Sequence, residues 1–172
     1  MEFYDIIKRR RSIRKFDQKP VEEDIIQKLI EYVSLVPSSR SIYPVRVYYT
    51  TEPERIIALS KAKAHGSEFL ASATLVFIIC ADTTKSDVWI EDASIAATYT
   101  LLAAEDFNLG ATWVQIRNRF DKQGRKSEDV VKEVIGIDDP GIAVLCMIGM
   151  GYKGESKSPS SSSSMKEYFY RV

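Results

Sequence analysis

The residues with the clearest chemical potential form one run near the N-terminus, the basic segment Lys8–Lys15, in which six of eight residues are cationic. Arginine binds phosphate through two parallel hydrogen bonds, and Ser12 can add a hydroxyl and a backbone N–H. Four arginines so close together repel one another unless solvent or an anion screens their charge. The run is therefore a candidate anion site, with a solvated helix C-terminus and a nuclear-localisation-like signal as the alternatives.

Other residue types with catalytic or ligand chemistry are few. His65 is the single histidine, and the two cysteines, Cys80 and Cys146, stand in apolar runs without a Cys-x-x-Cys pair. A structural zinc site needs about four cysteine or histidine ligands. We therefore expect two buried thiols, no metal site and no iron–sulfur cluster. A Ser-His-Asp hydrolase could use only His65.

The glycines at Gly149, Gly151 and Gly154 match the spacing of the dinucleotide fingerprint G-x-G-x-x-G. That fingerprint also needs a helix directly after it, because the phosphate binds at the helix N-terminus. Here the sequence continues Glu-Ser-Lys-Ser-Pro. The spacing therefore does not predict a Rossmann site.

Length and composition fit one globular domain. The chain has 172 residues, of which 45% are hydrophobic and 28% charged, and its 24 Lys and Arg balance 24 Asp and Glu. A zero net charge argues against a dedicated nucleic-acid or membrane-surface protein. The N-terminus is charged where a signal peptide is apolar, and the longest apolar run, Ala73–Ala81, is too short to cross a membrane. We expect a soluble, cytoplasmic protein.

The elements that must position these residues follow from the spacing of apolar side chains. We predict helices at Glu2–Arg10, Val21–Val36, Glu54–Lys63, Trp89–Asn108 and Glu128–Ile135, and strands at Val45–Thr50, Leu75–Ala81, Ala111–Ile116 and Ile142–Met150. This order indicates an α/β or α+β sheet covered by helices. The helix at Trp89–Asn108 is apolar around most of its circumference, which indicates either a central core helix or one packed on a second subunit.

Taken with its context, Arg10–Phe16 resembles the N-terminal motif of the nitroreductase family of FMN-dependent oxidoreductases, and Pro37–Arg40 resembles that family's Pro-Ser-Ser loop. The resemblance continues in order through Leu59–Gly66, Trp89–Ala96, Gly110–Arg117 and Ile148–Tyr152. It covers about residues 3–153 and is similar to a short-chain branch of the family. We therefore expect an FMN-binding domain at 1–153 and a Ser-rich linker and C-terminal arm at 154–172. The aromatic end of this arm either reaches another subunit or is frayed.

The resemblance implies an α+β fold, with a central, mainly antiparallel sheet flanked by helices, in an intertwined homodimer with FMN at the subunit interface. Arg10 and Ser12 would hold the FMN phosphate, Arg11 would add backbone contacts, and Arg14 would lie near the phosphate or the flavin N1/O2 edge. The partner's flavin would be reached by Pro37, Ser38, Ser39 and Ser41. The residues beside the isoalloxazine ring, with backbone amides toward N5 and O4, would be Trp113, Val114, Gln115 and Ile116.

The activity implied is a ping-pong transfer of hydride from NAD(P)H through FMN to a nitroaromatic, quinone or similar acceptor, with no essential side-chain acid. His65 would face the flavin or lie on the surface. The alternatives are a non-catalytic flavin-binding or flavin-storage protein and, third, a nucleic-acid binder at the basic segment.

The sequence departs from the family pattern at two places. Where the family loop usually continues to asparagine and then glutamine-proline-tryptophan, this chain has Ser41, Tyr43, Pro44 and Val45. The family often has a C-terminal basic pair on the phosphate, for which the candidates here are Lys153, Lys157, Lys166 and Arg171.

Overall fold

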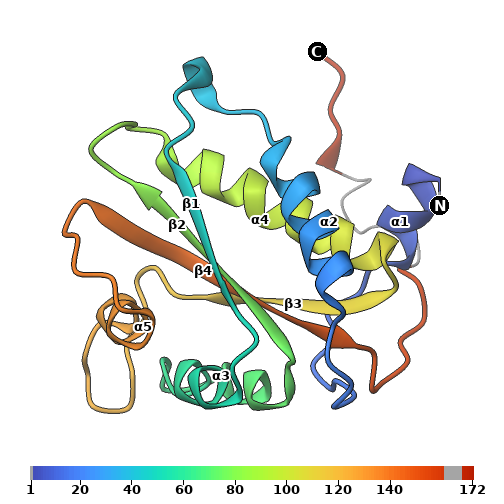
Figure 1. Cartoon of the computed structure of the whole chain (residues 1–172). Coiled ribbons are helices and arrows are strands. Elements are labelled where there is room, and N and C mark those ends of the chain that lie inside the picture. Colours follow the sequence, from blue (N-terminus) through green and yellow to red (C-terminus); the bar gives the residue numbers. More distant parts are fainter. Residues whose placement is uncertain (1, 161–167) are drawn as a thin grey trace.

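The computed structural model describes residues 2–160 and 168–172, and this part of the chain contains five α-helices and four strands (Figure 1). The helices are α1 (Phe3–Arg9), α2 (Glu23–Ser34), α3 (Pro53–Leu59), α4 (Trp89–Asp106) and α5 (Ser127–Ile135). The strands are β1 (Val45–Thr50), β2 (Leu75–Asp82), β3 (Leu109–Gln115) and β4 (Ile142–Tyr152). The predicted kinds and order of elements are confirmed.

The helices α1 to α4 end one to four residues earlier than predicted, and for α2 and α3 the structure shows a local reason. α2 ends at Ser34, two residues short, because Pro37 disfavours the helical conformation at the residue before it. α3 ends at Leu59, four residues short, because the N–H groups of Lys61 and Ala62 donate to carbonyls three residues back. Such a 3₁₀-type turn tightens and closes a helix.

The four strands form one sheet in the order β1-β2-β4-β3, in which all neighbours are antiparallel. β2 and β4 are central, and β2 is buried on both faces from Leu75 to Ala81, as its lack of alternation predicts. Antiparallel pairing excludes the α/β alternative, which needs parallel strands. The α+β fold that the resemblance implies is confirmed.

Helices cover both faces of the sheet. α2 and α4 lie on one face, whereas α3 and α5 lie on the other (Figure 1). Side chains of β2 alternate between the two cores, with Phe77 facing α2 and α4 and Ile78 facing α3 and α5. The apolar helix α4 packs against α2 and the sheet through a row of buried alanines, which confirms its reading as a core helix.

After β4 the chain turns back along the basic segment. Residues Lys153–Ser160, here called the strap, pair with Phe16 at their start, and their last residue donates a backbone hydrogen bond of 3.0 Å to the first carbonyl of the basic segment. On its other side the basic segment joins β3, where the Ile13 N–H donates to the Ala111 carbonyl at 3.1 Å. The basic segment therefore lies between β3 and the strap.

The first residues of the predicted linker, 154–160, thus contact the predicted FMN-binding domain. The domain boundary after residue 153 stays a prediction. Residues 161–167, which hold most of the serine tract and Lys166, lie outside the described residues. Tyr168, Phe169 and Tyr170 are exposed. Their docking on another subunit stays a prediction as well.

The two cysteines are buried free thiols, as predicted. Burial raises the pKa of Cys80 to about 12 and also raises the pKa of Cys146, because an apolar environment disfavours the thiolate. Neither thiol is therefore a nucleophile at neutral pH. Within the ranges that the structure describes, no helix is both long and apolar enough to span a membrane.

Candidate functional site

Close packing between β3 and the extended chain after α1 positions the basic segment. Ile13 is 2% exposed and lies directly over Gly110. A Cβ atom placed on Gly110 would lie 2.7 Å from Ile13 Cγ2, which is closer than carbon atoms can pack. Glycine at this position therefore permits the contact that holds the candidate anion-binding residues against the sheet.

Gly110→Ala is accordingly expected to lower the free energy of unfolding by about 1–3 kcal/mol, the usual cost of overpacking a dense core. Urea unfolding of both proteins, followed by circular dichroism, measures the difference. Unchanged stability would show that the basic segment moves off β3 without cost.

A cavity of about 570 Å³ separates the basic segment from the strap. Its charged lining residues are Arg9, Arg11, Glu105, Lys153, Glu155 and Lys157. Glu105, only 3% exposed, accepts hydrogen bonds of 2.8 and 2.9 Å from Lys153 and lies 3.5 Å from Arg9 Nε. Arg9 and Lys153 therefore share one buried negative charge.

Glu155 of the strap binds the backbone of the basic segment. Its carboxylate accepts the backbone N–H of Arg14 at 2.6 Å and lies 3.1 Å from Lys157 Nζ. The Arg14 N–H and Lys157 together hold the pKa of Glu155 below its ordinary value. Lys157 also donates to the Ser12 carbonyl at 2.6 Å, and Arg11 donates to the Ser158 carbonyl. The strap thus accepts hydrogen bonds from the Arg11 side chain and from the backbone N–H groups of Arg14 and Lys15.

Arg10 differs from these neighbours. Its side chain is half-buried and has no hydrogen-bond or ion-pair partner among the described residues. Arg14, which is exposed, has its guanidinium 5.8 Å from the centre of the Phe69 ring. Because side chains alternate along an extended segment, Ser12 and Arg14 lie on the side opposite to Arg11 and Ile13, which line the cavity. A half-buried guanidinium without a partner is a group that an anion would stabilise.

The predicted β3 residues lie next to the basic segment, joined to it at Ser12 and Ala111. The side chains of Trp113 and Gln115 are half-buried and hydrogen-bonded to each other at 3.0 Å. The side chains of Val114 and Ile116 instead point into the core beside α3 and α5. The N–H of Ile116 donates to the Leu145 carbonyl at 3.1 Å. The strand register therefore leaves Trp113 and Gln115 as the side chains on the face opposite to that core.

The Pro-Ser-Ser loop lies elsewhere on the molecule. It is held at the start of α4, where Asp92 accepts hydrogen bonds from Ser38 and Ser39, whereas the basic segment meets Glu105 near the end of α4. These two carboxylates are thirteen residues apart on one helix, about 20 Å along its axis. One chain therefore does not bring the two predicted halves of the flavin site together.

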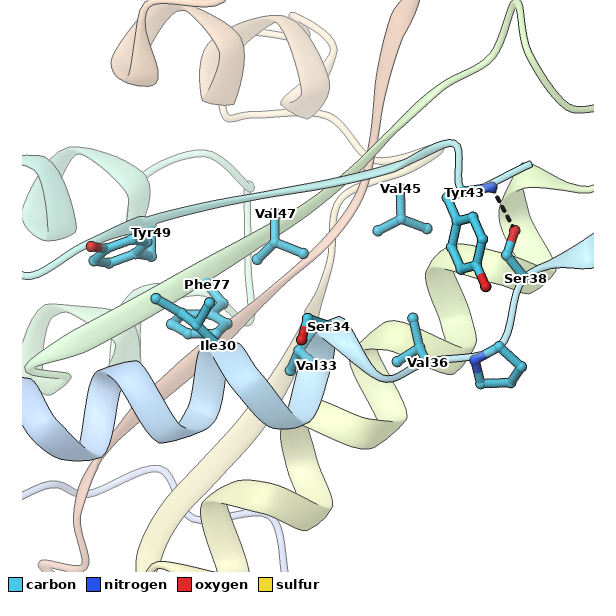
Figure 2. A pocket seen from close by; sticks show the side chains of 11 residues that line it. Ile30, Val33, Ser34, Val36, Ser38, Tyr43, Val45, Val47, Tyr49 and Phe77 are labelled. Atoms are coloured by element: carbon cyan, nitrogen blue, oxygen red, sulfur yellow. Dashed lines mark hydrogen bonds between the residues drawn. The ribbon is translucent and has the colours of Figure 1, made fainter. Parts of the chain in front are cut away.

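A second cavity, of about 280 Å³, lies between α2 and β1 beside this loop (Figure 2). Its walls are mostly apolar, with Val33 and Val47 near its middle. Figure 2 shows Ser38 and Tyr43 at one end and Tyr49 at the other. The cavity walls suit an apolar group.

Sequence reasoning did not find Asp92, Glu105 or Glu155. The signal available for the first two was an acidic residue at an inward position of an otherwise apolar helix. His65 is exposed, and Lys63 beside it has its pKa lowered mainly by burial. Within the described ranges, no group of three or more His, Cys, Asp or Glu side chains could hold a metal ion.

Comparison with known proteins places these features in context. The model of the nitroreductase family matches residues 7–67 and 52–152. An FMN-dependent nitroreductase from Clostridium difficile R20291 has a similar structure, with a TM-score of 0.92 and 34% identity over 97% of this chain and 98% of its own. A protein of Archaeoglobus fulgidus that carries the name NADH dehydrogenase/NAD(P)H nitroreductase is 27% identical over 160 residues, which are 91% of this chain and 88% of its own. An FMN reductase [NAD(P)H] of Bacillus subtilis is 30% identical over 82 residues, 48% of this chain and 32% of its own.

Proposed function

Because this chain belongs to the nitroreductase family of NAD(P)H-dependent flavin oxidoreductases, with FMN as cofactor, we propose that it passes hydride from NAD(P)H to a nitroaromatic, quinone or similar acceptor. FMN supplies the hydride-carrying ring system when it is bound. The tasks left to the chain are to bind the cofactor, orient it and exclude water.

The observation that carries the proposal is the half-buried Arg10 guanidinium, which has no partner among the described residues, whereas its neighbours Arg9 and Arg11 are held by Glu105 and Ser158. An FMN phosphate would supply the missing anion, with Ser12 adding its hydroxyl. Among the C-terminal candidates, Lys157 already reaches the Ser12 carbonyl and pairs with the partly exposed Glu155, whereas Lys153 is paired with the buried Glu105. We therefore favour Lys157 over Lys153 as the additional phosphate cation.

The flavin contacts predicted for Arg14, Arg11 and β3 are compatible with the structure, except that two of the β3 side chains face away from the site. Arg14 is exposed and free to take the phosphate or the N1/O2 edge, where positive charge favours the reduced flavin. Because Val114 and Ile116 turn into the core, we propose that only backbone atoms of these residues meet the ring. The Ile116 N–H is not one of them, because it donates to the Leu145 carbonyl. Trp113 and Gln115 are the side chains that β3 offers there. Arg11 contributes backbone contacts, as its side chain is held by Ser158.

The separation of about 20 Å between the two halves along α4 supports a site built from two copies of the chain. In this arrangement Pro37, Ser38, Ser39 and Ser41 of one copy approach the FMN held by the basic segment of the other. The homodimer is part of the proposal, and sedimentation velocity of the purified protein tests it.

A visible absorption spectrum tests the function directly. The protein is mixed with FMN, freed of excess and titrated anaerobically with NADH and then NADPH. We expect retained yellow colour that at least one nucleotide bleaches, and reoxidation by added menadione or a nitroaromatic. Yellow protein that neither nucleotide bleaches would support a flavin-storage role instead, and colourless protein would contradict the proposal.

A further inference from the structure

Asp92 is a buried carboxylate to which the proposed function assigns no role. It lies in the first turn of α4, is 2% exposed, and accepts hydrogen bonds from Ser38 Oγ at 2.6 Å and from the Ser39 N–H at 3.1 Å. Burying a charge is costly unless hydrogen bonds compensate for lost water. Both bonds go to the Pro-Ser-Ser loop, and so the carboxylate and the loop depend on each other.

The bond to Asp92 fixes the direction of the other hydrogen bond that the Ser38 hydroxyl makes. A carboxylate only accepts, and so the single hydrogen of the Ser38 hydroxyl points to Asp92. The Ser38 oxygen in turn accepts the Tyr43 N–H at 2.9 Å (Figure 2). Neither the Ser38 hydroxyl nor the Ser39 N–H can therefore donate to a ligand. The hydroxyls of Ser39 and Ser41 have no partner in the part of the chain that the structure describes, and the loop can present them as donors.

The loop also holds an unfavourable backbone conformation. Arg40, Ser41 and Tyr43 have φ values of 51°, 53° and 53°, a region that residues with a side chain adopt at a cost. Such conformations persist where surrounding contacts over-determine them. The exposed ion pair between Arg40 and Asp87 contributes little to this, because solvent screens it. The buried Asp92 is therefore the stronger anchor.

We propose that Asp92 is a positioning residue of the flavin site, which acts through Ser38 to hold the strained loop so that Ser39 and Ser41 face the cofactor. It also keeps Tyr43 at the end of the apolar cavity between α2 and β1. This inference rests on the proposed function.

Asp92→Asn tests the role with little change in size. In the wild type both carboxylate oxygens accept, one from the Ser38 hydroxyl and one from the Ser39 N–H. An asparagine has only one accepting oxygen, and so its NH₂ group faces one of these donors and that hydrogen bond is lost or reversed. We expect the dissociation constant of FMN to rise roughly tenfold or more. We also expect a shifted visible spectrum of the flavin at saturating FMN. Asp87→Asn is the matched control, because it removes an exposed carboxylate that bonds to the same loop, and it should leave both readouts unchanged.

A lower melting temperature of Asp92→Asn with wild-type FMN affinity and spectrum would show a structural role alone and overturn the inference. If Asp92→Asn does not fold, Ser38→Ala removes the central bond with a smaller change, and wild-type FMN affinity in that variant would equally overturn it. Wild-type protein that binds no FMN would refute the proposed function, and this inference with it. FMN binding by the wild type that weakens in Asp92→Asn and Ser38→Ala, but not in Asp87→Asn, supports both the proposed function and this inference.

Discussion

Arg10→Ala is expected to weaken FMN binding roughly ten- to hundredfold, because a charge-assisted hydrogen bond to phosphate contributes about 1.5–3 kcal/mol. Among the described residues no internal anion compensates Arg10, whereas Glu105 lies beside Arg9. The loss should therefore fall on the ligand rather than on the fold. Titration of apoprotein with FMN, followed by quenching of flavin fluorescence, measures the dissociation constant.

Arg55→Ala is the matched control for this change. Arg55 is an exposed arginine on α3 that pairs with Glu52 at 2.6 Å, away from the basic segment. Its removal takes away the same charge and should leave FMN affinity within about twofold of wild type. Equal loss in both variants would indicate a non-specific charge effect, and unchanged affinity in Arg10→Ala would show that the phosphate binds elsewhere.

Leu70→Ala is expected to lower the free energy of unfolding by about 2–5 kcal/mol. Leu70 is fully buried in the core beneath α3 and α5 and packs on β4 at Gly149. Removing its side chain loses buried apolar contacts and leaves a cavity that rigid strands cannot close. Urea unfolding at pH 7 measures the change.

The same contact predicts coupling with Gly149→Ala. A Cβ atom on Gly149 would lie 2.3 Å from Leu70 Cδ2, and so this variant alone should be destabilised by overpacking. In the double variant the new methyl group occupies part of the space that Leu70 leaves. We expect the loss in free energy of unfolding of the double variant to be about 0.5–3 kcal/mol smaller than the sum of the losses of the two single variants. Strictly additive losses would mean that Leu70 and Gly149 do not share this space.

The kinds of elements and their order could be predicted from the sequence alone. Val45–Thr50 matches β1 residue for residue, and the unbroken apolar run of β2 correctly indicates burial on both faces. These properties depend on the spacing of side chains a few residues apart, which the local backbone geometry determines. For the same reason the short motifs at Arg10–Phe16 and Pro37–Arg40 could be found without any structure.

The surroundings of the motif residues could not be predicted in this way. A sequence shows the cations of the basic segment as equivalent, but the fold brings Glu105 to Arg9 and leaves Arg10 without a partner among the described residues. The sequence places Val114 and Ile116 within the segment that resembles the family's flavin contacts, Gly110–Arg117. In the structure, however, their side chains point into the core.

The sequence by itself thus determined which residue types are available, in which elements and in which order. The tertiary structure decided which charges remain unpaired, which side chains face the site, and that the loop held by Asp92 lies far from the basic segment within one chain. Periodicity is a local property of the backbone, whereas charge pairing, burial and register arise only when segments distant in the sequence meet.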